Sequence, residues 1–491
     1  MTPILLSVII RLESISFSIY NITYTTGYRM KKKWKHLSPS QTIMAGFALM
    51  ILIGAFLLNL PIASKSGNSI GFINALFTAT SANCVTGLVV VNTMEHWTLF
   101  GKVVILLLIQ FGALGFMSVI TIAMILMKQQ ISLRSRQAIQ ASFNQDNIGG
   151  MVKLVKKVVV ITFTVEAIGA ILLAIAFYSE TQMKMSEAVF QGVFHSISAF
   201  CNAGFDNIGT DSFIPFQLSV PVNFIVMTLI IAGGLGFTVW LEIIELVRNK
   251  SRRSLRLRII HMSLHSKIVF SVTGILIVGG MLLFLLFEWS NPDTIGSLHV
   301  SGKIQATLFQ SVTLRTAGFN TVSQGALTEI SKFISCIFML IGGSSASTAG
   351  GMKTVTIGII IISMVSVLKG RSKLEIYGRT LPFDLLQKAL TVATTMLIVV
   401  FTSTILLHFT ESYNSFQYSF LDLLFETCSA AATVGLSTGV TSGISSAGKV
   451  ILILCMYLGR LSPVTVVVAL NAKLHEQTNG IGFPEERIII G

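Results

Sequence analysis

The chain has 491 residues, of which 52% are hydrophobic and only 11% are charged, and its mean hydropathy is +0.77. Soluble proteins carry about 25% charged residues, so this composition excludes a soluble globular domain, a disordered chain and a secreted disulfide framework. It indicates a protein that crosses a membrane several times. The five cysteines are scattered through apolar segments without a CxxC pair, so they predict neither a disulfide framework nor a metal site.

Eight segments are apolar enough, and long enough, to be membrane spans, since a spanning helix needs about 20 such residues. They cover residues 42–61, 101–127, 153–178, 219–247, 267–288, 332–368, 386–409 and 447–471, the sixth with an interruption. Before them, residues 1–38 contain an apolar run that is too short to span. We expect these residues to form a cytoplasmic N-terminal extension.

The basic residues, 35 against 21 acidic ones, are concentrated beside the predicted spans. The richest stretches are residues 29–35, 128–157, 248–267 and 369–388. Basic loops remain on the cytoplasmic side of a membrane, so we expect a multi-pass protein of the plasma membrane with both termini in the cytoplasm. These stretches do not form a basic face interleaved with aromatic residues, which argues against nucleic-acid binding.

Four long connections are then expected outside: residues 62–100, 179–218, 289–331 and 410–446. Each contains an apolar stretch of about 10 to 14 residues, which suits a re-entrant half-helix better than a span. These connections carry more acidic than basic residues, Asp206 among them. The excess acid either attracts cations to a pore mouth or is an ordinary solvated surface.

A similar loop follows each short apolar stretch: SANCVTGL at 81–88, SAFCNAGF at 198–205, VTLRTAGF at 312–319 and SAAATVGL at 429–436. The glycines of these loops are 117, 114 and 117 residues apart. This spacing predicts an all-α protein of four repeats, each made of a span, a half-helix, a glycine loop and a span. We place the repeats at residues 39–127, 128–247, 248–368 and 369–474, with a C-terminal tail at 475–491.

Irregular backbone at membrane depth must be buried or line water, and four loops around one axis meet this condition together. Glycine adopts positive φ freely, so carbonyl oxygens can turn toward the axis and replace the hydration shell of a cation. We therefore predict an ion selectivity filter formed by Val85, Thr86, Gly87, Asn202, Ala203, Gly204, Thr316, Ala317, Gly318, Thr433, Val434 and Gly435. The alternative is that the glycines serve only helix packing, which favours small residues inside the spans.

A run rich in glycine and serine interrupts the sixth span at residues 342–353. Such a run is a poor helix former and cannot face lipid as irregular backbone. It is either a bent helix or a flexible barrier beneath the filter, formed by Gly342, Gly343, Ser344, Ser345, Ser347, Thr348, Gly350, Gly351 and Lys353. The second spans of the other repeats also carry glycines at similar depth, and we expect them to weaken without breaking.

Two arginines lie within the apolar part of the chain. Arg460 lies inside the eighth span, where a charge is costly and usually faces a pore or a partner; a structural ion pair is the alternative. Arg315 lies three residues before Gly318. We expect Arg315 to form a structural ion pair with Glu426 on the next half-helix and so to brace adjacent repeats.

The four loops, their order and the surrounding spans resemble the Trk/Ktr/HKT superfamily of potassium transporters, and most closely the bacterial Ktr-type membrane subunit, over roughly residues 35–491. The most diagnostic stretches are 85–88, 315–319 and 433–436. The resemblance implies potassium uptake through a pore of four repeats in one chain, a gating loop at 342–353, and an arginine, Arg460, beneath the filter. Relatives with serine at the first filter glycine are often sodium-permeable, so Gly87 favours potassium.

The resemblance also implies a homodimer and a cytosolic ring of RCK/KTN-type nucleotide-binding subunits. The ring would press on residues 128–157 and 248–267 and on the end of the interrupted sixth span. Residues 485–491 would tuck into the dimer interface, and membrane lipid would surround the spans. Potassium is then the substrate, with stimulation by sodium and no cofactor in this chain. The membrane potential provides about 2.3 kcal/mol per charge per 100 mV, and symport with a second ion is the alternative energy source.

Two other functions remain to be compared. A sodium-selective or weakly selective monovalent cation transporter would share the same architecture, and a single glycine per loop predicts looser selectivity than that of a potassium channel. A membrane enzyme would need converging catalytic groups. Glu166, Glu242 and Glu245 lie in the predicted spans without such partners, so we expect no enzyme.

Overall fold

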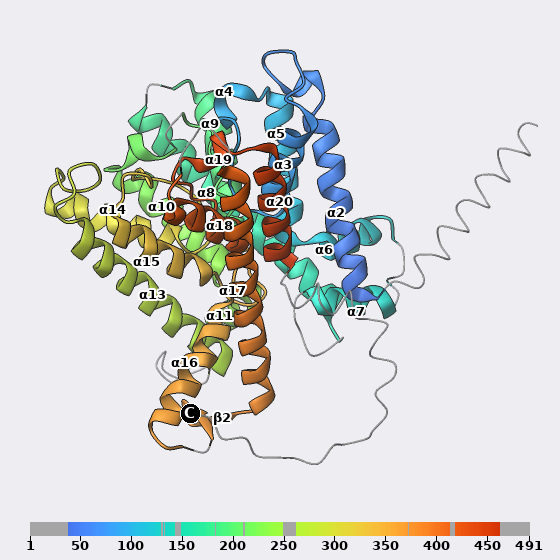
Figure 1. Ribbon diagram of the computed structural model, residues 1–491. Helices are drawn as coiled ribbons and strands as arrows, with labels where there is room; N and C mark the ends of the chain where they lie inside the picture. The colour runs from blue at the N-terminus through green and yellow to red at the C-terminus, as the bar shows by residue number, and fades with distance from the viewer. Residues whose placement is uncertain are drawn as a thin grey trace, which may run out of the picture.

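The computed structural model describes residues 38–128, 131, 133–142, 149–181, 183–209, 212–248, 262–371, 373–412 and 418–461. The N-terminal extension up to residue 37, the C-terminal tail at 475–491, and much of the stretch 248–267 lie outside the described residues. Figure 1 shows a mostly helical molecule whose long helices run between two ends. One end carries α4 (Thr93–His96) and is called the α4 end; the other carries a small hairpin and is called the hairpin end.

The helices follow one another in four sets of the same order. The first set contains α2 (Pro39–Leu58), η1 (Pro61–Ala63), α3 (Phe72–Asn83), α4, α5 (Leu99–Leu114), α6 (Phe116–Leu126) and α7 (Leu133–Ser142). The second contains α8 (Met151–Glu180), α9 (Met185–Phe200), η2 (Ile214–Phe216), α10 (Val220–Gly234) and α11 (Phe237–Arg248). In both, a long first helix is followed by a short half-helix, α3 or α9, and then by a bent pair.

The third set contains α13 (Leu264–Glu288), α14 (Val300–Thr313), α15 (Glu329–Leu340) and α16 (Thr354–Leu368). Between it and the fourth set lies a departure from the expected all-α architecture, an antiparallel hairpin of β1 (Leu374–Ile376) and β2 (Arg379–Leu381). The fourth set contains α17 (Phe383–Glu411), α18 (Phe420–Ala432), α19 (Val440–Gly443) and α20 (Ser446–Leu461).

Serine and threonine residues fix where several of these helices begin. The side-chain oxygen of each accepts a hydrogen bond from a backbone N–H of the first turn, which would otherwise lack a partner. The capping residues are Ser38 at α2, Thr98 at α5, Ser219 at α10, Ser263 at α13, Thr328 at α15 and Ser419 at α18. The starts of first spans, second spans and a half-helix are therefore encoded locally.

Four helices, α2, α8, α13 and α17, are each long and apolar enough to cross a membrane. They correspond to the first, third, fifth and seventh expected spans. The second and fourth expected spans are pairs of helices, α5 with α6 and α10 with α11, bent by 95° and 103°. The expectation that these spans weaken without breaking was wrong. The breaks fall at Gly115 and Gly236, whose φ angles of 81° and 89° are incompatible with a continuing helix.

The sixth expected span is divided into α15 and α16 by the irregular segment at residues 341–353, where the glycine- and serine-rich run lies. The eighth is α20, which is described as far as Leu461. The remainder of that expected span, 462–471, lies outside the described residues. In the part of the chain that the structure describes, the second spans of the first three sets are bent or divided, and α20 of the fourth set is one continuous helix.

The four half-helices form a closed ring with the second spans. Each half-helix packs on the first span of its own set, as α2 on α3 and α8 on α9, and also contacts the second span of the preceding set. These second contacts are α5 with α9, α10 with α14, α15 with α18, and α20 with α3. Because the last contact returns to the first set, the four sets surround a common centre.

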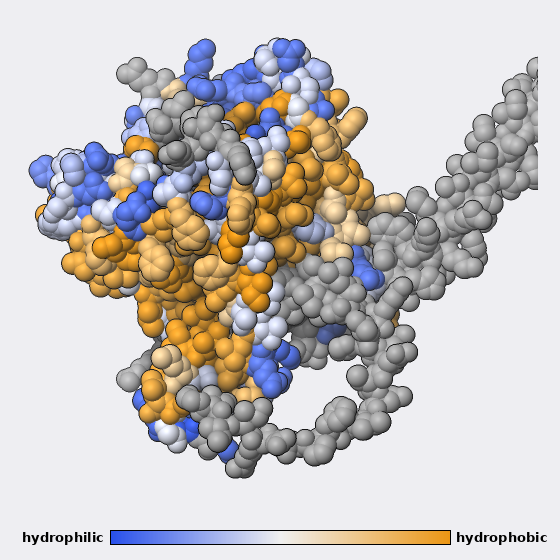
Figure 2. All heavy atoms as spheres, in the orientation of Figure 1, coloured by the Kyte–Doolittle hydropathy of each residue, from blue (hydrophilic) through white to orange (hydrophobic). Residues whose placement is uncertain are grey.

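Apolar residues are exposed between the two ends of the molecule. Figure 2 shows apolar residues across the middle of the visible face, with polar residues gathered mostly at the upper and lower ends. Many large apolar side chains of the long helices are exposed, among them Phe56, Ile171, Leu286 and Phe401. Exposed apolar surface of this extent is typical of contact with lipid, so the chain is a multi-pass membrane protein.

Candidate functional site

The four glycine loops share one unusual backbone conformation. In each, the residue two positions before the glycine has a positive φ angle, which residues with a side chain rarely adopt. These angles are 58° at Val85, 59° at Asn202, 64° at Thr316 and 54° at Thr433. The glycines themselves have φ angles of 100° at Gly87, 68° at Gly204, 80° at Gly318 and 94° at Gly435. The loops therefore share the same backbone region at both positions although their sequences differ.

The four glycines meet at the centre of the ring of half-helices. A Cβ atom added to Gly87 would lie 2.6 Å from the carbonyl oxygen of Ala203, too close for any side chain. The same applies around the ring, where the facing pairs are Gly87 with Ala203, Gly204 with Ala317, Gly318 with Val434, and Gly435 with Thr86. Each glycine thus faces the carbonyl that precedes the glycine of the next loop, and the last pair closes the circle.

All the predicted filter residues are buried, and the structure brings all four loops together. Every half-helix ends shortly before its glycine, at Asn83, Phe200, Thr313 and Ala432. The C-terminal end of a helix carries a partial negative charge, so four such ends are directed toward the ring. A narrow ring of carbonyl oxygens in this field suits a dehydrated monovalent cation.

One residue of each half-helix contacts the loop that follows, and the sequence analysis missed all four. The carbonyl oxygens of these residues accept from the N–H just before the glycine, and their hydroxyls bond the glycine N–H or the carbonyl after the glycine. They are Ser81, Ser198, Thr313 and Ser429. A signal was present, since serine stands six positions before the glycine in three of the four loops.

The segment between α15 and α16 closes on itself at its two ends. The N–H of Gly342 donates to the carbonyl of Met352 at 2.9 Å, and the N–H of Met352 donates to the carbonyl of Leu340 at 3.0 Å. Within it, Lys353 Nζ donates to the carbonyl of Ala349 at 2.6 Å. The predicted gate residues 342–353 therefore form a compact loop.

This loop lies against the filter loops and the bend of the second set. Added Cβ atoms at Gly342 and Gly350 would contact the side chains of Thr316 and Thr433. On the other side, the N–H of Ser344 donates to the carbonyl of Gly234 at 2.8 Å. The break between α10 and α11 thus exposes carbonyl groups that hold the loop.

Arg460 fastens the same loop from α20. Its Nη1 donates to the carbonyl of Thr348, and its Nη2 donates to the carbonyls of Gly112 at 2.6 Å and Ala113 at 3.4 Å. Thr348 also donates from Oγ1 to the carbonyl of Phe200 at 3.0 Å. Within the described residues, no carboxylate forms an ion pair with Arg460. This part of the chain therefore does not show the alternative, a structural ion pair. Carbonyls at the C-terminal end of α5 face its charge instead.

The expected ion pair between Arg315 and Glu426 was wrong. Among the described residues, the ion pairs join Lys332 to Glu329 and Asp422, and Lys388 to Asp384; Arg315 and Glu426 take no part in them. The carboxylate of Glu426 turns instead to the segment after its own filter loop. There it accepts from Ser437 Oγ, from Thr441 N at 3.3 Å and from Thr441 Oγ1 at 3.0 Å.

Asp206 is the second residue after Gly204, on a segment that leads from the ring to the α4 end. This direction follows from Gly209, whose carbonyl accepts from the side chain of Asn92 at the start of α4 at 2.7 Å. Burial raises the pKa of Asp206 to about 6, and a hydrogen bond from Ser212 opposes this rise. Val89, Asn320 and Ser437 occupy the corresponding positions in the other loops, so only this loop carries an acid there.

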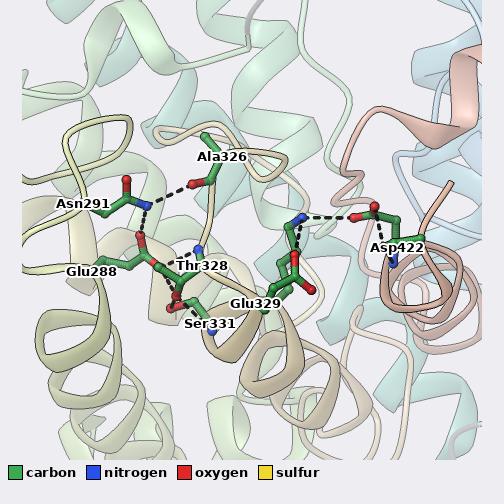
Figure 3. Close-up of polar contacts among 9 residues, drawn as sticks. Glu288, Asn291, Ala326, Thr328, Glu329, Ser331 and Asp422 are labelled. Carbon is green, nitrogen blue, oxygen red and sulfur yellow. Dashed lines mark hydrogen bonds and ion pairs between the residues drawn. The ribbon is translucent and has the colours of Figure 1, made fainter. Parts of the chain in front are cut away.

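A polar network ties the third and fourth sets together at the starts of α15 and α18. In Figure 3, dashed lines connect Glu329 and Asp422 through the ammonium group of Lys332, which is 3.4 Å from Glu329 Oε1 and 3.1 Å from Asp422 Oδ1. The figure also shows Glu288 of α13 accepting from Thr328 Oγ1 at 2.7 Å. These contacts fix the starts of α15 and α18 relative to each other.

Fold and site together define a class, a multi-pass helical membrane protein built around a ring of backbone carbonyls. In the part of the chain that the structure describes, no group of three or more His, Cys, Asp or Glu side chains could hold a metal ion. The chain matches the family described as "TrkH: Cation transport protein" over residues 13–481, and it belongs to this family. The resemblance to Trk and Ktr proteins is thereby confirmed, and the chain is a membrane cation transporter and not an enzyme.

Individual relatives match nearly the whole chain. It is 38% identical to "Potassium/sodium uptake protein NtpJ" of Enterococcus hirae, over 94% of this chain and 99% of the relative. It is 39% identical to "Ktr system potassium uptake protein B" of Bacillus subtilis, over 94% of this chain and 98% of the relative. The crystal structure of the potassium transporter TrkH from Vibrio parahaemolyticus has the same fold, with a TM-score of 0.67, 17% identity, and coverage of 88% of this chain and 84% of that one.

Proposed function

We propose that this chain takes up potassium across the plasma membrane through the ring formed around Gly87, Gly204, Gly318 and Gly435. The observation that carries the proposal is the closure of this ring, in which each glycine faces the carbonyl that precedes the next glycine. Two relatives at 38% and 39% identity are named for potassium uptake. The twelve residues predicted as the filter, Val85 to Gly435, would act as one selectivity element.

The orientation of the chain in the membrane, and with it the direction of transport, would follow from the distribution of basic residues. The described basic residues near the hairpin end include Lys369, Arg371, Lys373 and Arg379, and basic segments remain cytoplasmic. The hairpin end would then face the cytoplasm and the α4 end the outside, with the four repeats around the pore as predicted. The membrane potential, worth about 2.3 kcal/mol per charge per 100 mV, would draw a monovalent cation inward.

The loop at 342–353 would be the gate of this pore. It lies directly against Thr316 and Thr433 of the filter loops, and hydrogen bonds from several elements hold it there. The bonds from Arg460 to Thr348, and from Ser344 to Gly234, would have to break for the loop to move aside. Gating would therefore be a change between a bonded and a released loop.

Regulation would come from the cytoplasmic side. Relatives belong to a "Ktr system", and we propose that this chain likewise forms a homodimer that binds a cytosolic RCK/KTN-type nucleotide-binding ring. We propose that the ring presses on α7 and on the end of α16, which leads into the hairpin. Potassium would be the substrate, with sodium as a stimulating ion.

One observation favours a second candidate, uptake of sodium as well as potassium. The relative from Enterococcus hirae is named for both ions. The filter offers one ring of glycine-preceding carbonyls, which is less than the several rings of a potassium channel. A weakly selective monovalent cation transporter would have the same geometry.

Expression in a potassium-uptake-deficient bacterium tests both candidates, with and without a co-expressed RCK-type subunit. Growth on low-potassium medium, together with potassium uptake that excess sodium does not inhibit, is the result expected for a potassium transporter. Equal uptake of the two ions would favour the second candidate. No uptake of either ion at verified membrane expression would contradict the proposed function.

A further inference from the structure

Ser81 and Ser429 each bond their filter loop twice. The carbonyl of Ser81 accepts from the N–H of Thr86 at 2.8 Å, and its hydroxyl oxygen accepts from the N–H of Gly87 at 3.1 Å. Ser429 repeats this arrangement with Val434 at 2.8 Å and Gly435 at 3.0 Å. Both serines are completely buried, so water does not compete for these bonds.

Ser198 stands at the same position in the second loop, and Thr313 stands one position nearer the glycine in the third loop. Both bond their loops differently. Their carbonyls accept from the residue before the glycine, at 2.7 Å for Ser198 and 2.9 Å for Thr313. Their hydroxyls instead donate beyond the glycine, to the carbonyl of Phe205 at 2.6 Å and to the carbonyl of Phe319 at 2.8 Å. The loops therefore divide into two neighbouring pairs, the first with the fourth and the second with the third.

The bond to the glycine N–H fixes the direction of a carbonyl. A trans peptide is planar, so its N–H and C=O groups point in opposite directions. Holding the N–H of Gly87 back toward α3 turns the carbonyl of Thr86 the other way, and that oxygen faces Gly435 in the ring. Likewise, the bond from Gly435 to Ser429 turns the carbonyl of Val434 toward Gly318.

We propose that Ser81 and Ser429 are positioning residues for the discrimination between potassium and sodium. Their hydroxyls hold the carbonyls of Thr86 and Val434 in the ring. Ser198 and Thr313 hold their loops one residue further along and have a smaller influence on discrimination. This inference rests on the proposed function. Without the hydroxyl, the buried glycine N–H has no partner, and the peptide is free to rotate its carbonyl out of the ring.

The experiment compares Ser81→Ala and Ser429→Ala with Thr80→Val. Thr80 is the matched control, because it is adjacent to Ser81, equally buried, and its hydroxyl bonds only Leu76 of its own helix, at 2.7 Å. The readout is the ratio of potassium to sodium uptake rates at equal membrane expression. If the contribution of one hydrogen bond falls entirely on the discrimination between potassium and sodium, its loss changes this ratio about two- to tenfold.

We expect Ser81→Ala and Ser429→Ala to lower the ratio by that factor, Ser198→Ala to lower it less, and Thr80→Val to leave it unchanged. Ser81→Thr, which keeps a hydroxyl, should retain most of the discrimination. An unchanged ratio in both alanine variants, or an equal loss in Thr80→Val, would overturn the inference. If Ser81→Ala does not reach the membrane, Ser429→Ala decides alone. Absence of wild-type uptake would instead remove the proposed function itself.

Discussion

Arg460 on α20 donates a hydrogen bond to the carbonyl of Thr348, in the loop that lies beneath the filter. The other nitrogen of the same guanidinium donates to Gly112, at the C-terminal end of α5. One side chain of the fourth set thereby joins the first set to the loop of the third. Because a guanidinium presents donors in a rigid fork, the two bonds hold the loop at a defined position.

Arg460→Ala should release this loop and raise the uptake rate. Hydrogen bonds of a charged donor contribute about 1.5 to 3 kcal/mol each, so losing the bond to Thr348 should shift the closed–released equilibrium about tenfold or more. The measurement is initial potassium uptake at equal membrane expression. Arg460→Lys keeps the charge and one donor position, so its uptake rate should lie between those of the wild type and Arg460→Ala. Uptake by Arg460→Ala at the wild-type rate would contradict this role.

Gly87→Ser should lower potassium uptake at least about tenfold and increase inhibition by sodium. A serine at a φ of 100° is strained by about 1 to 3 kcal/mol, and its Cβ would lie 2.6 Å from the carbonyl of Ala203. Gly67→Ser is the matched control, since Gly67 also has a positive φ, 69°, but nothing lies within 4 Å of its added Cβ. A similar loss in both variants would mean that backbone strain, and not the ring, is responsible.

The repeat architecture could be predicted because it leaves a mark in the sequence. Four glycines at nearly constant spacing, each between apolar segments, predicted half-helices and loops that the structure places around one centre. The positive φ angles at Val85 and Thr433 could not be predicted. Neither residue is a glycine, and the conformation arises from the packing of the loops against one another.

Hydrogen bonds that depend on the folded geometry account for what the sequence analysis missed. The pairing of Arg315 with Glu426 assumed that a buried charge finds an opposite charge, but Glu426 finds three donors within its own repeat, on Ser437 and Thr441. The breaks at Gly115 and Gly236 were not anticipated because glycine is common within membrane helices. The break at Gly236 leaves the carbonyls of Gly233 and Gly234 free to accept from the N–H groups of Thr348 and Ser344.

Asp422→Asn should destabilise the protein by about 1 to 3 kcal/mol, because the carboxylate that pairs with the largely buried ammonium of Lys332 becomes a neutral amide. The two side chains are 9% and 21% exposed. The measurement is thermal unfolding of the purified protein in detergent. The double variant Lys332→Met with Asp422→Asn should lose less than the sum of the single changes, since it leaves no buried charge without its partner.

Lys388→Met provides the comparison for that prediction. Lys388 pairs with Asp384 at 3.2 Å, but the two side chains are 74% and 58% exposed. Surface pairs of this kind contribute little, so the melting temperature should not change measurably. An equal loss of stability in Lys388→Met and Asp422→Asn would show that burial of the Lys332 pair has no particular effect.

Asp206 should make potassium uptake dependent on external pH. Burial raises its pKa to about 6, although a hydrogen bond from Ser212 partly opposes the rise. The carboxyl is therefore charged at pH 7.5 and takes up a proton as the pH falls to 5. A unit charge about 4 Å away attracts a cation by about 1 kcal/mol in water. Uptake at subsaturating potassium should therefore fall about two- to fivefold over this range, while uptake at saturating potassium changes little.

At subsaturating potassium, Asp206→Asn should take up potassium at every pH as slowly as the wild type does at pH 5. Its uptake should no longer depend on pH over this range. Asp293→Asn serves as the control, because Asp293 is an exposed acid of another connection, far in sequence from any filter glycine. It should keep the wild-type pH profile. If Asp206→Asn retains the same fall between pH 7.5 and 5, then another group titrates at the mouth, and the single acid after Gly204 does not concentrate the ion.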